Sequence, residues 1–217
     1  MSAFEYKEYS VLMSVYHKER PEYLKQAIES IQVQSLSTND FVLVCDGPLN
    51  DELDAVIQTK QLEMGENLNV VRLAKNGGLG NALNEGIKHC KNELVARMDS
   101  DDIAYPDRCE KQIAVFNTHS EVSICSGIVE EFTTDPHTVD TRRVPPETNA
   151  EIVEFAKKRN PFNHPCVMYR KSVVEAVGSY QDFYLPEDYY LWLRMLMAGY
   201  QGYNIQEPLL HMRAGSE

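Results

Sequence analysis

A short stretch near the middle of the chain joins an apolar run, an acidic loop and the start of a helical pattern. Residues 94–108 read LVARMDSDDIAYPDR, with Asp99, Asp101 and Asp102 directly after the apolar residues and Pro106 before the helix. Like charges this close repel one another, and an unpaired buried carboxylate is costly. The stretch is therefore either a solvated loop or a site for a positively charged ligand.

The same alternation of apolar runs and helical patterns extends through residue 126. Strands that are apolar throughout and separated by helices indicate a parallel sheet covered on both faces. We therefore expect an α/β fold with a mainly parallel central sheet flanked by helices. The predicted strands are 10–16, 41–47, 69–73, 94–99 and 122–127, and the predicted helices begin at Pro21, near residue 51, after Gly78 and at Pro106.

The pattern after residue 127 is less regular. It predicts a strand at 128–132, a loop at 135–148, a helix near 149–158, a strand from Cys166 to Tyr169, a short helix ending at Gly178 and a strong helix over 186–199. No repeat or linker divides the chain. We expect one domain over 1–217, with a nucleotide-binding-type first half over about 1–126 and an elaborated second half over about 127–217. Because the chain ends at the close of an expected strand, we also expect it to be truncated at its C-terminus.

Composition narrows the possible partners. The net charge of −12 and the pI near 5.0 argue against a nucleic-acid binder or a general binder of anionic membranes. No apolar run approaches the ~20 residues of a membrane-spanning helix, and the N-terminus has no signal-peptide pattern. The five cysteines form no C-x-x-C pair, which favours reduced, packed thiols in a cytosolic protein.

The acidic strand end has a geometric meaning in such a sheet. Ligands of parallel sheets bind at the carboxyl ends of the strands. Residues two apart point to the same side of an extended chain, so Asp99 and Asp101 can face one ligand. Two carboxylates suit Mg²⁺ or Mn²⁺ shared with phosphates, whereas the alternative is a solvated loop before a helix. Asp46 ends a second strand at the same edge, where most such residues are only turn formers.

Two further segments have a structural and a functional interpretation. The glycines of residues 76–86 either let backbone approach a ligand or pack the loop against the sheet. In PEDYYLWLRMLMAG, residues 186–199, helical spacing puts Asp188 on the face of Leu191, Trp192 and Met195. An acid in this place either interacts with the helix N-terminus or acts as a general base in a cleft.

Together these segments resemble the inverting family-2 glycosyltransferases of the GT-A fold over nearly the whole chain. The resemblance rests on the order of VLMSVYHKERPEYLKQAIESIQVQS (11–35), VLVCDGP (42–48), NGGLGNALNEGIKHC (76–90), ARMDSDDIAYPDR (96–108) and PEDYYLWLRM (186–195). RNPFNHPCVMYRKSVV (159–174) and EDYYLWLRML (187–196) are similar to bacterial exopolysaccharide enzymes of the amylovoran-biosynthesis type.

The resemblance implies a nucleotide-diphospho-sugar donor, usually a UDP-sugar, and a divalent metal ion, Mg²⁺ or Mn²⁺. It implies a saccharide or lipid-linked acceptor and a cytoplasmic location, with peripheral contact at the inner face of the membrane. The roles it implies are a base and ribose pocket for Ser14, Val15 and Tyr16, a uracil contact for Asp46, ribose or metal for Asp99, metal for Asp101, the general base for Asp188 and a diphosphate contact for Arg213.

Two residues and two other functions stay open. The resemblance assigns no role to Glu19, and His164 either faces the acceptor or is structural. DSDDI also approaches the nucleophile motif of haloacid-dehalogenase-like phosphohydrolases, although that family carries the motif on its first strand. A non-catalytic nucleotide-sugar binder is the third interpretation, and it would be expected to lack the base or the metal acid.

Overall fold

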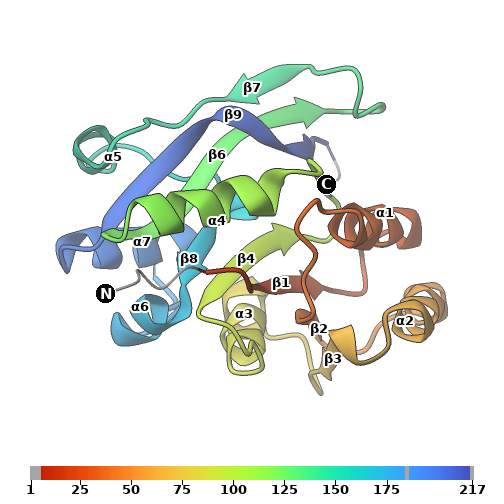
Figure 1. Ribbon diagram of the computed structural model, residues 1–217. Helices are drawn as coiled ribbons and strands as arrows, with labels where there is room; N and C mark the ends of the chain where they lie inside the picture. Colours follow the sequence, from red (N-terminus) through yellow and green to blue (C-terminus); the bar gives the residue numbers. More distant parts are fainter. Residues whose placement is uncertain (1–5, 184–185, 216–217) are drawn as a thin grey trace.

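A single sheet runs through the whole of the computed structural model, which describes residues 6–183 and 186–215 (Figure 1). Within these residues the sheet has nine strands in the order β3-β2-β1-β4-β8-β6-β9-β5, and β7 pairs with β6. The strands are β1 (Ser10–Val15), β2 (Phe41–Cys45), β3 (Leu68–Arg72), β4 (Leu94–Asp99), β5 (Ile103–Ala104), β6 (Val122–Phe132), β7 (Thr141–Arg143), β8 (Met168–Arg170) and β9 (Gln201–Arg213).

Helices connect most of these strands. They are α1 (Pro21–Gln32), α2 (Asp51–Met64), α3 (Leu79–Ile87), α4 (Arg108–Thr118), α5 (Asn149–Phe155), α6 (Lys171–Ala176) and α7 (Glu187–Met197), with 3₁₀ turns at Gly65–Asn67 and His164–Cys166. The predicted alternation through residue 126 is confirmed. The helix expected at Pro106 begins two residues later, and the one expected over 149–158 is shorter.

The first half of the chain forms the parallel part of the sheet. β1 lies between β2 and β4, and β2 also pairs with β3, all in parallel. The mainly parallel α/β prediction is confirmed for this half. Its inner strands β1, β2 and β4 are buried on both faces, which explains why they are mainly apolar.

The second half extends the sheet with reversed strands. β8 lies between β4 and β6 and is antiparallel to both. The two strands expected at 122–127 and 128–132 are one continuous strand, β6, which pairs in parallel with β9. The segment 135–148 was expected to be a loop, but it contains β7. Short strands such as β5 and β7 take their conformation from a neighbouring strand, so their own sequence gives little signal.

Helices cover both faces of the sheet. Leu24 and Ile28 of α1 pack with Phe116 of α4 in one buried cluster, which also includes alternate residues of β1. Leu83 of α3 and Trp192 of α7 belong to a second cluster on the other face. The alternation of side chains along β1 thus supplies two cores, and the expected inward face of α7 is confirmed by its buried residues.

Strand register aligns the carboxyl ends of three central strands. Ser14 is paired with Asp99 across β1 and β4, and Val15 with Cys45 across β1 and β2. The residues that follow β1, β2 and β4 therefore meet at one edge of the sheet.

Two sequence expectations concern the chain as a whole. All five cysteines are free and buried, as predicted. Among residues 6–183 and 186–215, no helix has both the length and the apolar character needed to cross a bilayer.

Candidate active site

A cavity of about 360 Å³ opens at the carboxyl ends of β1, β2 and β4. The loops after these strands and the start of α3 supply its walls. The lining residues are Ser14, Tyr16, Lys18, Glu19, Asp46, Asn76, Gly78, Leu79, Asp99, Ser100 and Asp101. The structure thus brings together five residues singled out in the sequence, namely Ser14, Tyr16, Asp46, Asp99 and Asp101.

Asp99, at the end of β4, is held by a buried arginine on its own strand. Arg97 Nη1 and Nη2 donate to the two carboxylate oxygens of Asp99 at 2.9 and 2.5 Å. The Arg97 side chain is 1% exposed, whereas that of Asp99 is 36% exposed. Residues two apart on a strand share a face, so this pair follows from the strand geometry. Arg97 therefore balances the negative charge that Asp99 places at the cavity wall.

Asp102 lies behind the cavity and is poorly compensated. Its Oδ1 accepts the backbone N–H of Arg213 at 2.9 Å, but its buried Oδ2 has no hydrogen-bond partner in the described part of the chain. Burial raises the pKa of Asp102 well above its usual value, and the nearby carboxylates of Asp99 and Asp101 raise it further. Asp102 therefore takes up a proton more readily than an exposed aspartate.

Asp46 is used to hold the glycine-rich loop before α3. Its two carboxylate oxygens accept the backbone N–H groups of Gly77 and Gly78 at 2.8 and 3.0 Å. Gly47 has a φ of +87°, and a Cβ at this position would lie 2.6 Å from the backbone nitrogen of Asn76. The backbone amides of Gly77 and Gly78 therefore pack the loop against the sheet. This is the structural interpretation of the glycines.

The remaining wall carries the loop after β1. Tyr16 is 43% exposed, so its ring is available to a ligand. Ser100 donates a hydrogen bond from Oγ to Glu19 Oε2 at 2.6 Å, which ties this loop to the acidic turn. Glu19, which had no assigned role, is thereby placed in the cavity wall.

The donor set of this cavity fits a hard divalent cation. Its acidic side chains are Glu19, Asp46, Asp99 and Asp101, and its one basic side chain is Lys18. A diphosphate alone would meet net repulsion there. Among the described residues, no group of three or more His, Cys, Asp or Glu side chains is arranged to enclose a metal. Mg²⁺ commonly uses one or two carboxylates together with substrate phosphates, so a complete protein cage is not required.

Asp188 sits at the start of α7 in a buried polar cluster. Asn160 Nδ2 donates to Asp188 Oδ2 at 2.6 Å, and His164 Nδ1 lies 3.9 Å from the same oxygen. Burial raises the pKa of Asp188, while hydrogen bonds from the Tyr189 backbone and from Asn160 lower it in part. The environment therefore makes Asp188 a stronger base than an exposed aspartate once it is deprotonated.

His164 is a neutral neighbour of this carboxylate. Burial lowers the pKa of His164 well below its usual value, and the positive charge of Arg97 lowers it further. Its Nε2 lies 3.1 Å from the hydroxyl oxygen of Tyr180. Asp188 and His164 therefore do not form a charged pair near neutral pH.

Three predicted site residues lie outside the cavity lining, namely Asp188, Val15 and Arg213. The Val15 side chain is fully buried in the core, and its carbonyl accepts the N–H of Asp46 at 2.8 Å. Arg213 donates from Nη2 to Gln26 Oε1 at 2.8 Å, and its guanidinium carbon lies 3.7 Å from the centre of the Tyr23 ring. Its Nε also donates to the carbonyl of Asp101, so Arg213 supports the acidic turn from behind.

Sequence reasoning did not single out Arg97 or Asn160. Arg97 carried a weak signal, because a charged residue inside an otherwise apolar strand must find a buried partner on its own face. Asn160 gave no local signal, since its contact with Asp188 joins residues 28 positions apart.

Comparison with known proteins agrees with this geometry. The family described as Glycosyl transferase family 2 matches residues 10–178. The amylovoran biosynthesis glycosyltransferase AmsE of Erwinia amylovora is 44% identical over 209 residues, which cover 96% of this chain and 77% of that protein. The UDP-Gal:alpha-D-GlcNAc-diphosphoundecaprenol beta-1,3-galactosyltransferase of Escherichia coli is 38% identical over 210 residues, covering 97% and 75%.

A solved structure shares the fold. The S. aureus protein TarS, residues 1–349 in complex with UDP-GlcNAc, superposes with a TM-score of 0.74 at 18% identity. The match covers 96% of this chain and 59% of TarS 1–349. The chain thus spans about three fifths of this neighbour and about three quarters of each of the two relatives named above. The phosphohydrolase alternative is disfavoured, because its motif belongs to a first strand and here follows the fourth, β4.

Proposed function

Because the chain belongs to glycosyl transferase family 2, we propose that it moves a sugar from a UDP-sugar to a saccharide hydroxyl, with inversion at the anomeric carbon. The observation that carries this proposal is the acidic cavity at the ends of β1, β2 and β4. The activity would serve polysaccharide biosynthesis, as the name of AmsE indicates for that relative. We also propose that residues 1–217 form one catalytic domain, since one sheet runs through both halves.

The donor would occupy the cavity with its nucleoside against the loop after β1. The exposed Tyr16 ring offers a surface for the base, and Ser14 lies beside Asp99 for the ribose. Asp46 keeps a uracil contact only through oxygen lone pairs that the two glycine amides leave free. The E. coli relative is named for UDP-Gal, and the TarS complex contains UDP-GlcNAc.

Asp101 and Asp99 would hold a divalent metal ion, Mg²⁺ or Mn²⁺, together with the donor diphosphate. When bound, this ion neutralises charge that develops on the leaving UDP. Arg97 orients Asp99, because its two N–H groups match the carboxylate geometry. Arg213, behind Asp101, would support this turn, and a direct diphosphate contact by Arg213 stays a prediction.

Asp188 is the proposed general base. Its carboxylate would take the proton of the acceptor hydroxyl as that oxygen bonds to the anomeric carbon and the bond to UDP breaks. One displacement at the anomeric carbon inverts its configuration. Asn160 orients the carboxylate by donating to its Oδ2. A positioned base contributes roughly 10²–10⁴-fold in rate.

The acceptor would approach from the side of α7, away from the nucleoside. The E. coli relative is named for an acceptor in which GlcNAc is linked through a diphosphate to undecaprenol. We propose an acceptor of this lipid-linked class or its saccharide part, with peripheral contact at the cytoplasmic face of the membrane. The reduced, buried thiols accord with the cytoplasm.

A transfer assay tests the proposal. The purified chain is incubated with Mn²⁺, a panel of UDP-sugars and an alkyl-diphosphate-linked GlcNAc, and the product is identified by mass spectrometry and by the NMR coupling of its new anomeric proton. We expect transfer from one donor with inverted configuration. Asp188→Asn should lower the transfer rate about 100-fold or more while UDP binding is retained.

Three results would contradict this function. Full transfer by the Asp188→Asn variant would remove the assigned base. Donor binding without transfer by the wild type would favour the non-catalytic binder. An acyl-phosphate on Asp99 would favour the phosphohydrolase.

A further inference from the structure

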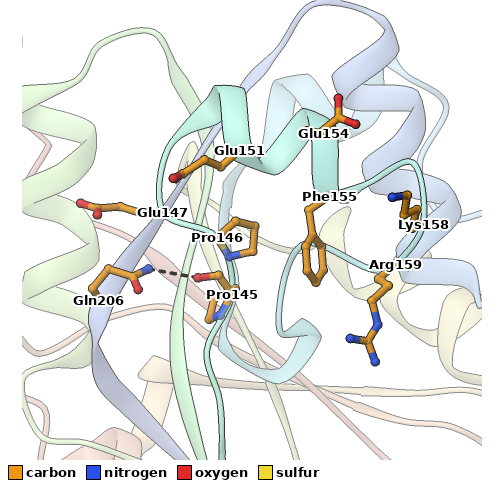
Figure 2. A pocket seen from close by; sticks show the side chains of 9 residues that line it. All are labelled: Pro145, Pro146, Glu147, Glu151, Glu154, Phe155, Lys158, Arg159 and Gln206. Carbon is orange, nitrogen blue, oxygen red and sulfur yellow. Dashed lines mark hydrogen bonds between the residues drawn. The ribbon is translucent and has the colours of Figure 1, made fainter.

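A second cavity, of about 610 Å³, lies in the second half of the chain (Figure 2). Its walls are α5, the segments on either side of α5 and one residue of β9. Glu147 and Glu151 are drawn at one side and Lys158 and Arg159 at the other, with the ring of Phe155 between them. No residue of this cavity lines the first one.

The walls of this cavity are built by long-range hydrogen bonds. Gln206 Nε2 donates to the Pro145 carbonyl at 3.1 Å, and Asn204 Nδ2 donates to the Pro146 carbonyl at 2.6 Å. At the start of α5, Thr148 and Glu151 form a reciprocal capping box. The site is therefore formed before any ligand arrives.

Two cations of this cavity lack partners among residues 6–183 and 186–215. The side chains of Lys158 and Arg159 are exposed and make no hydrogen bond or ion pair with the described residues. The neighbouring Lys157, in contrast, pairs with Glu154. In a chain with a net charge of −12, these two adjacent unpaired cations make their end of the cavity positive. The rest of the wall carries Glu147, Glu151 and Glu154, and Glu154 is paired with Lys157.

The segment that carries these cations is linked to the proposed base. Arg159 directly precedes Asn160, so their Cα atoms are ~3.8 Å apart, and Asn160 binds the Asp188 carboxylate. A second link joins the Tyr189 hydroxyl to the Ala156 carbonyl at 2.6 Å. The segment that carries the cations is thus attached to the start of α7 at two points.

We propose that this cavity binds the diphosphate of a lipid-diphosphate-linked acceptor, with Lys158 and Arg159 on the phosphates and the apolar surface of Phe155 against the adjoining sugar. The inference rests on the proposed function, because it takes Asp188 as the base. The acceptor hydroxyl at Asp188 and the diphosphate at Arg159 would then belong to the same sugar. The guanidinium of Arg159 suits bidentate phosphate binding, and Lys158 adds a point charge.

Acceptor kinetics test this assignment. The double variant Lys158→Gln/Arg159→Gln is compared with Lys157→Gln, which removes a charge of the same segment that already has a partner. The two acceptors are an alkyl-diphosphate-linked GlcNAc and the octyl glycoside of GlcNAc, which has no phosphate. We expect the double variant to raise KM for the diphosphate acceptor at least about tenfold. KM for the octyl glycoside and for the UDP-sugar should stay within about twofold, and Lys157→Gln should resemble the wild type.

Direct binding separates this inference from the proposed function. Calorimetric titration with decyl diphosphate, in the absence of donor, should give binding by the wild type and by Lys157→Gln but not by the double variant. If the protein binds decyl diphosphate in this way but transfers no sugar, the transferase proposal is wrong and the anion site is retained. Normal transfer with unchanged acceptor KM in the double variant would overturn the anion site alone.

One further outcome would also overturn it. The cations could instead serve the membrane surface, in which case the double variant loses binding to phosphatidylglycerol vesicles while KM for the short diphosphate acceptor is unchanged. All variants are exposed substitutions, and thermal unfolding confirms that each one is folded.

Discussion

Arg97 and Asp99, two residues apart on β4, join a fully buried guanidinium to a carboxylate at the cavity wall through two hydrogen bonds of 2.9 and 2.5 Å. The two partners are unequally exposed, so losing one is not equivalent to losing the other. An unpaired charge is costly when buried, whereas water can solvate a carboxylate that is one-third exposed.

We therefore predict that Asp99→Asn destabilises the protein more than Arg97→Met does. Asp99→Asn leaves a buried guanidinium without its hydrogen-bonded carboxylate and should cost about 3 kcal/mol. Arg97→Met leaves a carboxylate that water can reach, so its cost should be smaller. Urea unfolding at neutral pH measures both. The double variant Arg97→Met/Asp99→Asn should be more stable than Asp99→Asn alone. If its loss of unfolding free energy equals the sum of the two single losses, this explanation is wrong.

The pH profile of transfer should report the buried base. Burial raises the pKa of Asp188, and only the deprotonated carboxylate accepts the hydroxyl proton. The acidic limb of kcat/KM should therefore lie above the ~3.9 of an ordinary aspartate. The Asn160 hydrogen bond lowers this pKa, so Asn160→Ala should move the limb to higher pH. A limb that does not move would show that Asn160 does not act on the titrating group.

The same burial makes Asp188 costly to stability at neutral pH. A group with a raised pKa in the folded state contributes stability below its unfolded pKa and loses it as pH rises through the folded pKa. Asp188→Asn should therefore be more stable than the wild type at pH 7. The difference should shrink below about pH 4, where both states of the wild type are protonated. Equal free energies of unfolding of Asp188→Asn and the wild type at pH 7 would contradict a cost of burying the Asp188 carboxylate.

Cation and nucleotide should stabilise the protein together. The cavity lining is acidic, so UDP alone should raise the melting temperature less than UDP with Mn²⁺. At 100 times its dissociation constant a ligand adds about 2.7 kcal/mol. Asp101→Asn should abolish the Mn²⁺-dependent part. If UDP raises the melting temperature equally in Mn²⁺ and in EDTA, a cation shared by the protein and the nucleotide is contradicted.

The packing of α3 on the sheet depends on one glycine. A Cβ on Gly86 would lie 2.4 Å from Leu12 Cδ1 and 2.6 Å from Val44 Cγ2 in the core. Gly86→Ala should therefore destabilise the protein by about 1–3 kcal/mol. Gly80→Ala, on the same helix, is the matched control because its nearest contacts are 3.5 Å. Its effect on the free energy of unfolding should be small or favourable, since alanine is the better helix former.

The sequence by itself determined the elements and their polarity. Apolar runs and helical stripes are local properties of the backbone, so they located β1 to β4, α3 and α7. The carboxyl ends of parallel strands must lie at one edge, which brought Asp46 and Asp99 together. Helical spacing also put Asp188 on the buried face of α7.

Contacts between distant segments were decided only by the tertiary structure. Three such contacts join segments far apart in the chain. β8 pairs antiparallel with β4 and β6, Asn160 donates to Asp188, and Arg213 donates to the Asp101 carbonyl from behind the cavity. Such pairings depend on which surfaces remain to be covered once the core has formed, and no local period encodes that choice. The second cavity has the same origin, because its walls come from segments about 50 residues apart.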